Sequence, residues 1–98
     1  MTKFVSLSPS SKPDKKYVVK LLSESGREKH IHFGAKGMDD FTKTKDEEQK
    51  RRYIIRHERN EDWTNSGLET AGFWARWILW NKPSISASLA DVKSRFNL

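Results

Sequence analysis

The apolar residues between positions 16 and 35 alternate with polar ones, as they do in β-strands. Residues 16–22 (KYVVKLL) and 29–35 (KHIHFGA) are two such runs, separated by a loop that contains a glycine. Two β-rich runs around such a loop predict an antiparallel hairpin. Because neighbouring residues of a strand face opposite sides, Ile31 and Phe33 share one face of the second run, and the odd-numbered positions form the richer apolar face of the first. We therefore expect one side of the hairpin to be buried and the other to face water.

The first fifteen residues have a different pattern. Residues 3–7 (KFVSL) can add an edge strand to the hairpin, but Pro9 and Pro13 interrupt the chain directly after it. The segment is also rich in serine and lysine. The sequence thus predicts a basic flexible arm with a candidate edge strand at residues 1–15, and a single α+β domain at residues 16–98.

After residue 40 the apolar spacing becomes helical. A first helix is expected to begin near Thr44, which forms a capping box with Glu47. A second helix covers residues 70–81, opens on a capping threonine and ends before Pro83. A third helix covers residues 84–96 and has one apolar stripe. The stripe consists of Ile85, Leu89, Val92 and Phe96. The sequence therefore predicts an α+β fold, in which a small antiparallel hairpin or three-stranded sheet is followed by three helices.

The first of these helices carries acidic residues in its first turn and basic residues later, which suits the helix dipole. Three successive pairs are spaced for ion pairing at i,i+4. The pairs are Asp46–Lys50, Glu47–Arg51 and Glu48–Arg52. Arg56 and Arg59 have no acidic residue four positions earlier, and Tyr53, Ile54 and His57 form a narrow inward face. Most of the charge of this helix is therefore expected to be neutralised within it.

The second helix is apolar around its whole circumference. A helix of this kind is either buried on all sides or meets a partner, and a small domain has little material with which to surround it. Both interpretations stay open: the indoles form the core, or some of them lie in an exposed patch that docks onto protein or stacks on single-stranded bases. The candidate docking residues are Trp74, Arg76, Trp77 and Trp80.

The composition limits the size of the hydrophobic core and indicates which kind of partner the protein binds. The chain has 98 residues, of which 35% are hydrophobic and 33% charged, which allows one small domain with a modest core. It has 19 Lys and Arg against 13 Asp and Glu, and the resulting charge of +6 favours nucleic acid or an acidic protein surface as a partner. Cysteine is absent, which excludes disulfides, thiolate metal sites and cysteine nucleophiles.

The basic residues with the fewest acidic neighbours lie before and within the hairpin and late in the first helix. A mobile basic segment is suited to contacts with phosphates. The candidate phosphate-binding residues are Lys12, Lys15, Lys16, Lys20, Arg56 and Arg59.

The sequence offers little support for chemistry at a metal or a nucleophile. His30 and His32 lie on the same side of a strand, a spacing that two zinc ligands can have, but nothing fixes His57 or a carboxylate as a third ligand. The GAKG segment at residues 34–37 lacks the Lys-Ser/Thr ending of a phosphate-cradling loop. We predict no metal site, no cofactor, no catalytic residue and no small-molecule substrate, and therefore no enzyme.

A membrane location is not expected either. The longest nearly apolar stretch, residues 71–80, contains Arg76 and is much shorter than the roughly 17–25 residues that span a bilayer. The N-terminus has no apolar segment of the signal-peptide kind. We predict no membrane span and no secretion.

Three segments taken in order resemble a known family. They are FGAKGMDDFTKTKD, RYIIRHE and TAGFWARWILWNKPS, and the resemblance extends over residues 17–96. On these motifs the chain resembles a family of small uncharacterised basic proteins encoded by nucleocytoplasmic large DNA viruses, including giant viruses of algae and amoebae. The resemblance implies a viral protein in the virion or the interior of the infected host cell, and it implies no enzyme class.

The sequence supports two functional hypotheses. The first is a minor capsid protein or other virion component that docks onto capsid or other virion proteins. The alternative is a nucleic-acid-binding protein that contacts phosphates through its basic arm and its first helix. A continuous basic face on the folded surface would favour nucleic acid, whereas scattered charge around exposed tryptophans would favour protein docking.

Overall fold

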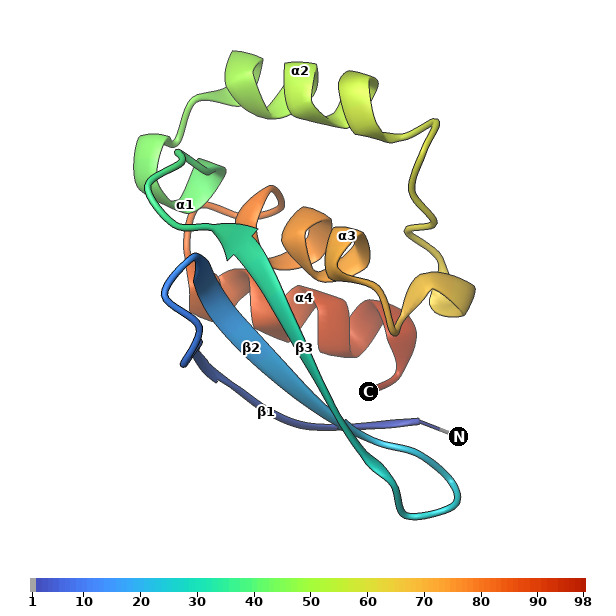
Figure 1. The fold of residues 1–98 in the computed structure, drawn as a ribbon. Helices are drawn as coiled ribbons and strands as arrows, with labels where there is room; N and C mark the ends of the chain where they lie inside the picture. The colour runs from blue at the N-terminus through green and yellow to red at the C-terminus, as the bar shows by residue number, and fades with distance from the viewer. Residues whose placement is uncertain (1) are drawn as a thin grey trace.

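A computed structural model describes residues 2–98 as a three-stranded antiparallel sheet followed by helices (Figure 1). The strands are β1 (Lys3–Pro9), β2 (Lys15–Leu22) and β3 (Glu28–Ala35), in that spatial order. The helical elements are α1 (Phe41–Thr44), α2 (Glu47–His57), the 3₁₀ turn η1 (Asn65–Gly67), α3 (Ala71–Trp74), the π-helix η2 (Ala75–Leu79) and α4 (Ile85–Phe96). The predicted α+β class is confirmed, with a three-stranded sheet and with short helical turns in addition to the three expected helices.

The central strand β2 places the apolar face of the sheet against the helices. Its register pairs Val19 with Leu7 of β1 and with Ile31 of β3. Val19, Leu21 and Phe33 have no exposed surface. The predicted hairpin and its buried face are therefore confirmed.

The candidate edge strand of the N-terminal segment is β1, which continues to Pro9 and pairs with β2. The ring of Phe4 lies 6.3 Å from that of Trp74, between centroids, and Leu7 packs against the core. The segment predicted as an arm thus contributes side chains to the same core as the rest of the domain. Met1, which the predicted arm included, lies outside the described residues.

The predicted start of the first long helix is wrong by two residues. Thr44 ends the short helix α1, and Lys45 then takes a left-handed conformation with φ of 54°. The helix α2 begins after Asp46, whose side chain accepts hydrogen bonds from the backbone N–H groups of Glu48 and Gln49. Aspartate is at least as good an N-cap as threonine. Asp46 takes this role, and the capping box expected at Thr44 therefore does not form.

Helix α3 begins where the sequence predicts, because the Thr70 hydroxyl accepts a hydrogen bond from the N–H of Phe73. The helix then widens into η2, so the predicted helix at residues 70–81 consists of one α-turn and one π-turn. Phe73, Trp74 and Ile78 have no exposed surface. A single apolar helix is therefore buried at the centre of the domain.

Neighbouring elements bury the aromatic side chains of this helix, which is one of the two arrangements that the sequence left open. The indole N–H of Trp74 donates to the carbonyl of Leu68 at 2.7 Å, and that of Trp77 donates to the carbonyl of Trp63 at 3.0 Å. Both acceptors lie in the loop between α2 and α3. The remaining ring contacts are Phe4–Trp74 from β1, Tyr53–Trp80 from α2, and Phe73–Phe96 and Trp77–Phe96 from α4. Helix α4 uses the predicted stripe, with Val92 fully buried.

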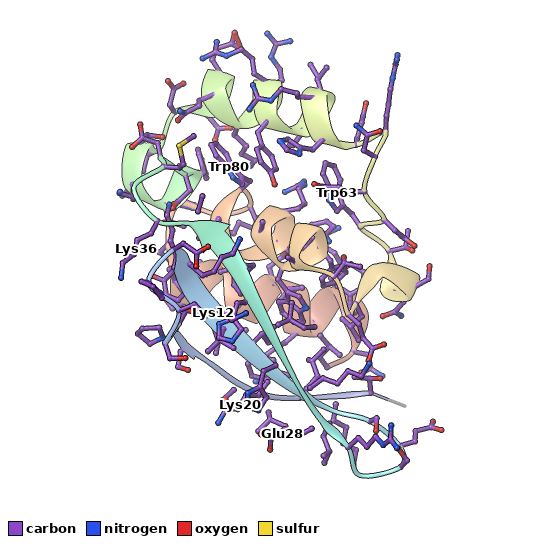
Figure 2. All side chains as sticks on the ribbon, in the orientation of Figure 1. Lys12, Lys20, Glu28, Lys36, Trp63 and Trp80 are labelled. Carbon is purple, nitrogen blue, oxygen red and sulfur yellow. The ribbon has the colours of Figure 1, made fainter. Side chains whose placement is uncertain are left out.

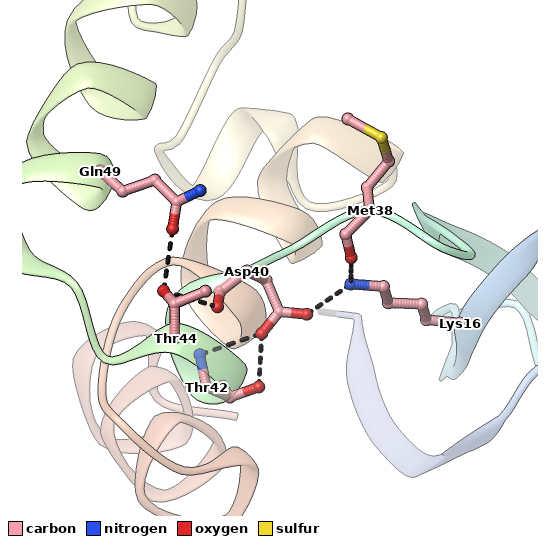
Figure 3. A network of polar contacts seen from close by, with 6 residues as sticks. All are labelled: Lys16, Met38, Asp40, Thr42, Thr44 and Gln49. Atoms are coloured by element: carbon pink, nitrogen blue, oxygen red, sulfur yellow. Dashed lines mark hydrogen bonds and ion pairs between the residues drawn. The ribbon is translucent and has the colours of Figure 1, made fainter.

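A polar network fixes the loop between β3 and α2 to the sheet (Figure 3). The Lys16 ammonium donates to the Asp40 carboxylate and to the backbone carbonyl of Met38, both at 2.5 Å. The same carboxylate accepts hydrogen bonds from the backbone N–H and the hydroxyl of Thr42, so that it also caps α1. The Lys16 and Asp40 side chains are only 12% and 3% exposed, which makes this the most buried ion pair among residues 2–98.

None of the helices in residues 2–98 is both long enough and apolar enough to cross a membrane.

Truncation of the central helix should destabilise the domain strongly. The Trp77→Ala variant removes a buried indole and is expected to lose about 3–5 kcal/mol of unfolding free energy, measured by urea denaturation. Ile55→Ala on α2, where the side chain is 57% exposed, is the control and should change stability by no more than about 0.5 kcal/mol. Equal losses in the two variants would contradict the packing of the central helix.

The Lys16–Asp40 pair gives a second prediction. Asp40→Ala leaves a largely buried ammonium without its carboxylate and should cost about 3–5 kcal/mol. Asp46→Ala removes an exposed helix cap and should cost about 1 kcal/mol. Because both aspartates cap a helix, the difference between the two losses of unfolding free energy measures the contribution of the ion pair to stability. A loss from Asp40→Ala no larger than that from Asp46→Ala would show that the pair does not stabilise the fold.

Candidate nucleic-acid interface

An exposed tryptophan patch, one of the two arrangements that the sequence left open, is absent from the described structure. Trp74, Trp77 and Trp80 are 0%, 9% and 8% exposed, because the sheet, α4, α2 and the loop before α3 surround them. The core interpretation of these indoles is the correct one, and they offer no surface for docking onto protein or for stacking on bases.

Arg76, the fourth predicted docking residue, is held inside the same aromatic cluster. Its guanidinium carbon lies 4.5 Å from the centre of the Trp77 ring and 5.5 Å from that of Trp63. One of its terminal N–H groups donates to the carbonyl of Trp80 at 2.6 Å, whereas its Nε is buried without a hydrogen-bond partner in residues 2–98. Burial lowers the pKa of Arg76, and the nearby Arg95 lowers it further. Arg76 therefore stabilises the core through ring contacts and is not displayed to a partner.

The six predicted phosphate-binding residues divide into separate groups. Lys16 is bound to Asp40 and Met38 in the polar network of Figure 3. Lys12 lies in the turn between β1 and β2, and Lys15 and Lys20 are half-buried on β2. Arg56 and Arg59 are exposed, on α2 and in the turn after it. Figure 1 shows α2 across the top of the molecule, far from the lower part of the sheet, while Figure 2 shows Lys20 beside that lower part.

The sheet surface around Lys12 and Lys20 is electrically mixed. His30 is hydrogen-bonded to Glu28 at 2.5 Å, and this bond is the main reason that the pKa of Glu28 is lowered, with Lys20 as a smaller cause. Partial burial lowers the pKa of His32, and Lys12 nearby lowers it further. The ring of His32 is therefore less readily charged than an ordinary histidine. This face combines lysines with a carboxylate and with a histidine that tends to stay neutral.

The histidines do not form a metal site. The Nδ1 atom of His32 is hydrogen-bonded to the Ser10 hydroxyl at 2.6 Å, and that of His57 to Glu61 at 3.1 Å. Within residues 2–98, no group of three His, Asp or Glu side chains is placed so that it could hold a metal ion.

Helix α2 pairs its charges differently from the prediction. The Glu48 carboxylate accepts two hydrogen bonds from Arg51, at 2.8 and 3.0 Å, in place of the expected bond to Arg52. These bonds lower the pKa of Glu48 and raise that of Arg51. Lys50 does not bind Asp46, because its ammonium donates to the carbonyl of Asn81 at 2.8 Å and lies 4.7 Å from the centre of the Phe41 ring.

As a result, three exposed arginines in this part of the described chain have side chains without an ion-pair partner. Arg52 and Arg56 are four residues apart on α2, and Arg59 lies in the turn after the helix. None of the three side chains makes a hydrogen bond or an ion pair with any residue of 2–98, although the backbone of Arg52 and Arg56 is part of the helix. We call Arg52, Arg56 and Arg59 the arginine row. The sequence pointed to Arg56 and Arg59 but not to Arg52, because i,i+4 spacing assigns Glu48 to Arg52, whereas Glu48 binds Arg51 at i,i+3.

Helix α2, which carries Arg52 and Arg56, is fixed to the body of the domain by two contacts. The Tyr53 ring stacks on Trp80, with centroids 4.4 Å apart and planes 9° from parallel. The Lys50–Asn81 hydrogen bond ties the first half of the helix to the chain just after η2. Three guanidinium groups are thus presented on and beside a fixed element.

Comparison with known proteins gives one match. Residues 5–57, which include nearly all of the three strands and the whole of α2, match the model of a family of unknown function, DUF5754. Neither the curated proteins nor the solved structures contain a match to the chain. The matched segment covers more than half of the 98 residues, and the chain therefore belongs to the family of unknown function DUF5754.

Proposed function

We propose that the protein binds nucleic acid and that the arginine row contacts its phosphates. The observation that carries this proposal is that three exposed guanidinium groups on and beside α2 make no hydrogen bond or ion pair in residues 2–98, although acidic side chains are close in sequence. Arginine is suited to phosphate because its planar group donates two parallel hydrogen bonds and stays charged at any ordinary pH.

The net charge of the chain supports the same partner. A charge of +6 draws a polyanion toward the protein, and phosphate contacts release counterions from the nucleic acid. The anchoring of α2 through Tyr53 and Lys50 reduces the conformational freedom that binding would have to remove, because the helix is already in place.

A role as a minor capsid or other virion protein is the second candidate, and it rests on the resemblance to viral proteins. The indoles that suggested docking are buried, so this role has to use other side chains. Ile55 favours it, since this residue is 57% exposed on α2 next to the half-buried Ile54. We rank this role below nucleic-acid binding, because the exposed large hydrophobic residues among residues 2–98, Val5, Met38 and Ile55, are few and lie on different segments, whereas the arginine row has three charges without ion pairs.

The test compares two double variants that remove the same charge from different surfaces. Binding of a labelled DNA duplex and of a labelled single strand is measured by fluorescence anisotropy over a salt series. Arg52→Gln/Arg59→Gln should weaken binding by roughly tenfold or more and should reduce the slope of log K against log salt by about two, one for each lost phosphate contact.

The matched control is Lys12→Gln/Lys20→Gln, which lowers the net charge equally on the sheet side. It should retain the salt slope of the unmodified protein and most of its affinity. Equal weakening by both double variants would show that only overall charge matters. Absence of binding by the unmodified protein at low salt would reject the proposal altogether.

A further inference from the structure

A cavity of about 330 Å³ lies under α2, between this helix, the end of β3 and the central helix. Its apolar wall includes Phe33, Ala75, Leu79 and Trp80. Figure 2 shows Trp80 in the region between α2 and the body of the domain. The volume is within the range of about 300–1,000 Å³ that is usual for small-molecule sites.

Three polar side chains that line the cavity have no hydrogen-bond partner in residues 2–98. They are the Lys15 ammonium, the Arg56 guanidinium and the Tyr53 hydroxyl, and all three are hydrogen-bond donors. Tyr53 is only 8% exposed as a whole residue, but its hydroxyl is not fully buried and is therefore open to a hydrogen-bond acceptor in the cavity. Burial also raises the pKa of Tyr53, with the Glu61 carboxylate as the second cause, so that the hydroxyl keeps its proton and remains a donor.

The other charged groups of the lining mostly have partners already. Lys16 is bound to Asp40, and His57 to Glu61, which also accepts a hydrogen bond from the Trp63 indole at 2.9 Å. Asp39 is exposed and has no ion pair with the described residues. The negative charge of Glu61 is balanced only when His57 is protonated. Lys15 and Arg56 are therefore unpaired cations in a lining that also holds the Asp39 and Glu61 carboxylates. A ligand that supplies acceptors would satisfy the donors that have no hydrogen-bond partner.

We propose that this cavity binds a small organic anion. Its carboxylate or phosphate group accepts hydrogen bonds from Lys15, Arg56 and Tyr53, and its flat apolar body packs against Ala75, Leu79 and Trp80. The sequence predicted no small-molecule substrate, and the site appears only when the end of the sheet and α2 are brought together. The site shares Arg56 with the arginine row, but the inference does not rest on nucleic-acid binding, since it is argued from the cavity lining.

The experiment is a titration followed by ¹H–¹⁵N correlation spectra of the intact protein, including the indole N–H signals. The probes are phenyl phosphate and benzoate, which distinguish a phosphate from a carboxylate ligand. Inorganic phosphate and benzyl alcohol are the controls for charge alone and for ring alone. At least one of the two aromatic anions should give saturable shifts at Trp80, Tyr53 and the residues around Phe33, and each control should bind at least about tenfold more weakly, because only the anions use both parts of the site.

Matched variants locate the anionic group. Lys15→Gln and Arg56→Gln should each weaken binding of the aromatic anion by about fivefold or more, since each removes a charged hydrogen bond. Lys12→Gln, at a basic residue that does not line the cavity, should leave the affinity unchanged. Tyr53→Phe should weaken binding without lowering the stability of the free protein, because its hydroxyl has no partner in residues 2–98 to lose.

The proposal is overturned if neither aromatic anion gives saturable shifts, or if the shifts lie away from the cavity. It is also overturned if inorganic phosphate binds as well as phenyl phosphate, or if Lys12→Gln weakens binding as much as Lys15→Gln. Its outcome is separate from that of the DNA assay, which uses variants at Arg52 and Arg59.

Discussion

The fold depends on the burial of one helix that is apolar on every side. Residues 71–80 carry three tryptophans and a phenylalanine, and a domain of this size can cover such a helix only if each neighbouring element contributes. The sheet supplies Phe4 and Phe33, α4 supplies Phe96, and the preceding loop supplies carbonyls to the indole N–H groups. On the remaining side, the Tyr53 ring of α2 stacks on Trp80.

This constraint explains where α2 lies and which of its residues are free. The helix is fixed to the body through Tyr53 and through the Lys50–Asn81 hydrogen bond. Of the acidic residues at its start, Asp46 is the N-cap and Glu48 pairs with Arg51. Arg52 and Arg56 are consequently left exposed. The cavity under α2 has the same origin, because the stacked ring pair holds this helix above the end of the sheet.

Much of the fold could be predicted from the sequence. Period-two alternation predicted the hairpin and its buried face, and the stripe from Ile85 to Phe96 predicted α4. The capping box at Thr44 was a wrong prediction because Asp46 competes for the same role two residues later. The π-turn at Ala75–Leu79 was not predictable, since the apolar pattern there has no preferred side and so carries no information about helix period.

The candidate site was predictable only in part. Unpaired charges can be inferred from spacing when no acidic residue lies four positions earlier, as for Arg56 and Arg59. Arg52 was missed because Glu48 has two basic residues within reach, and only the three-dimensional structure shows which of them it binds. The tryptophan side chains could not be assigned to core or surface, because their exposure depends on Tyr53 and Phe96, which are distant in sequence. The cavity is likewise formed by segments that no local pattern connects.

The measurement that tests the central claim most directly is a map of the DNA-contacting residues on the intact protein. In ¹H–¹⁵N correlation spectra recorded with a short DNA duplex, we predict shifts concentrated on α2 and the turn after it, around Arg52, Arg56 and Arg59. Shifts concentrated on β2 and the turn before it, around Lys12 and Lys20, or no shifts at low salt, would contradict the account.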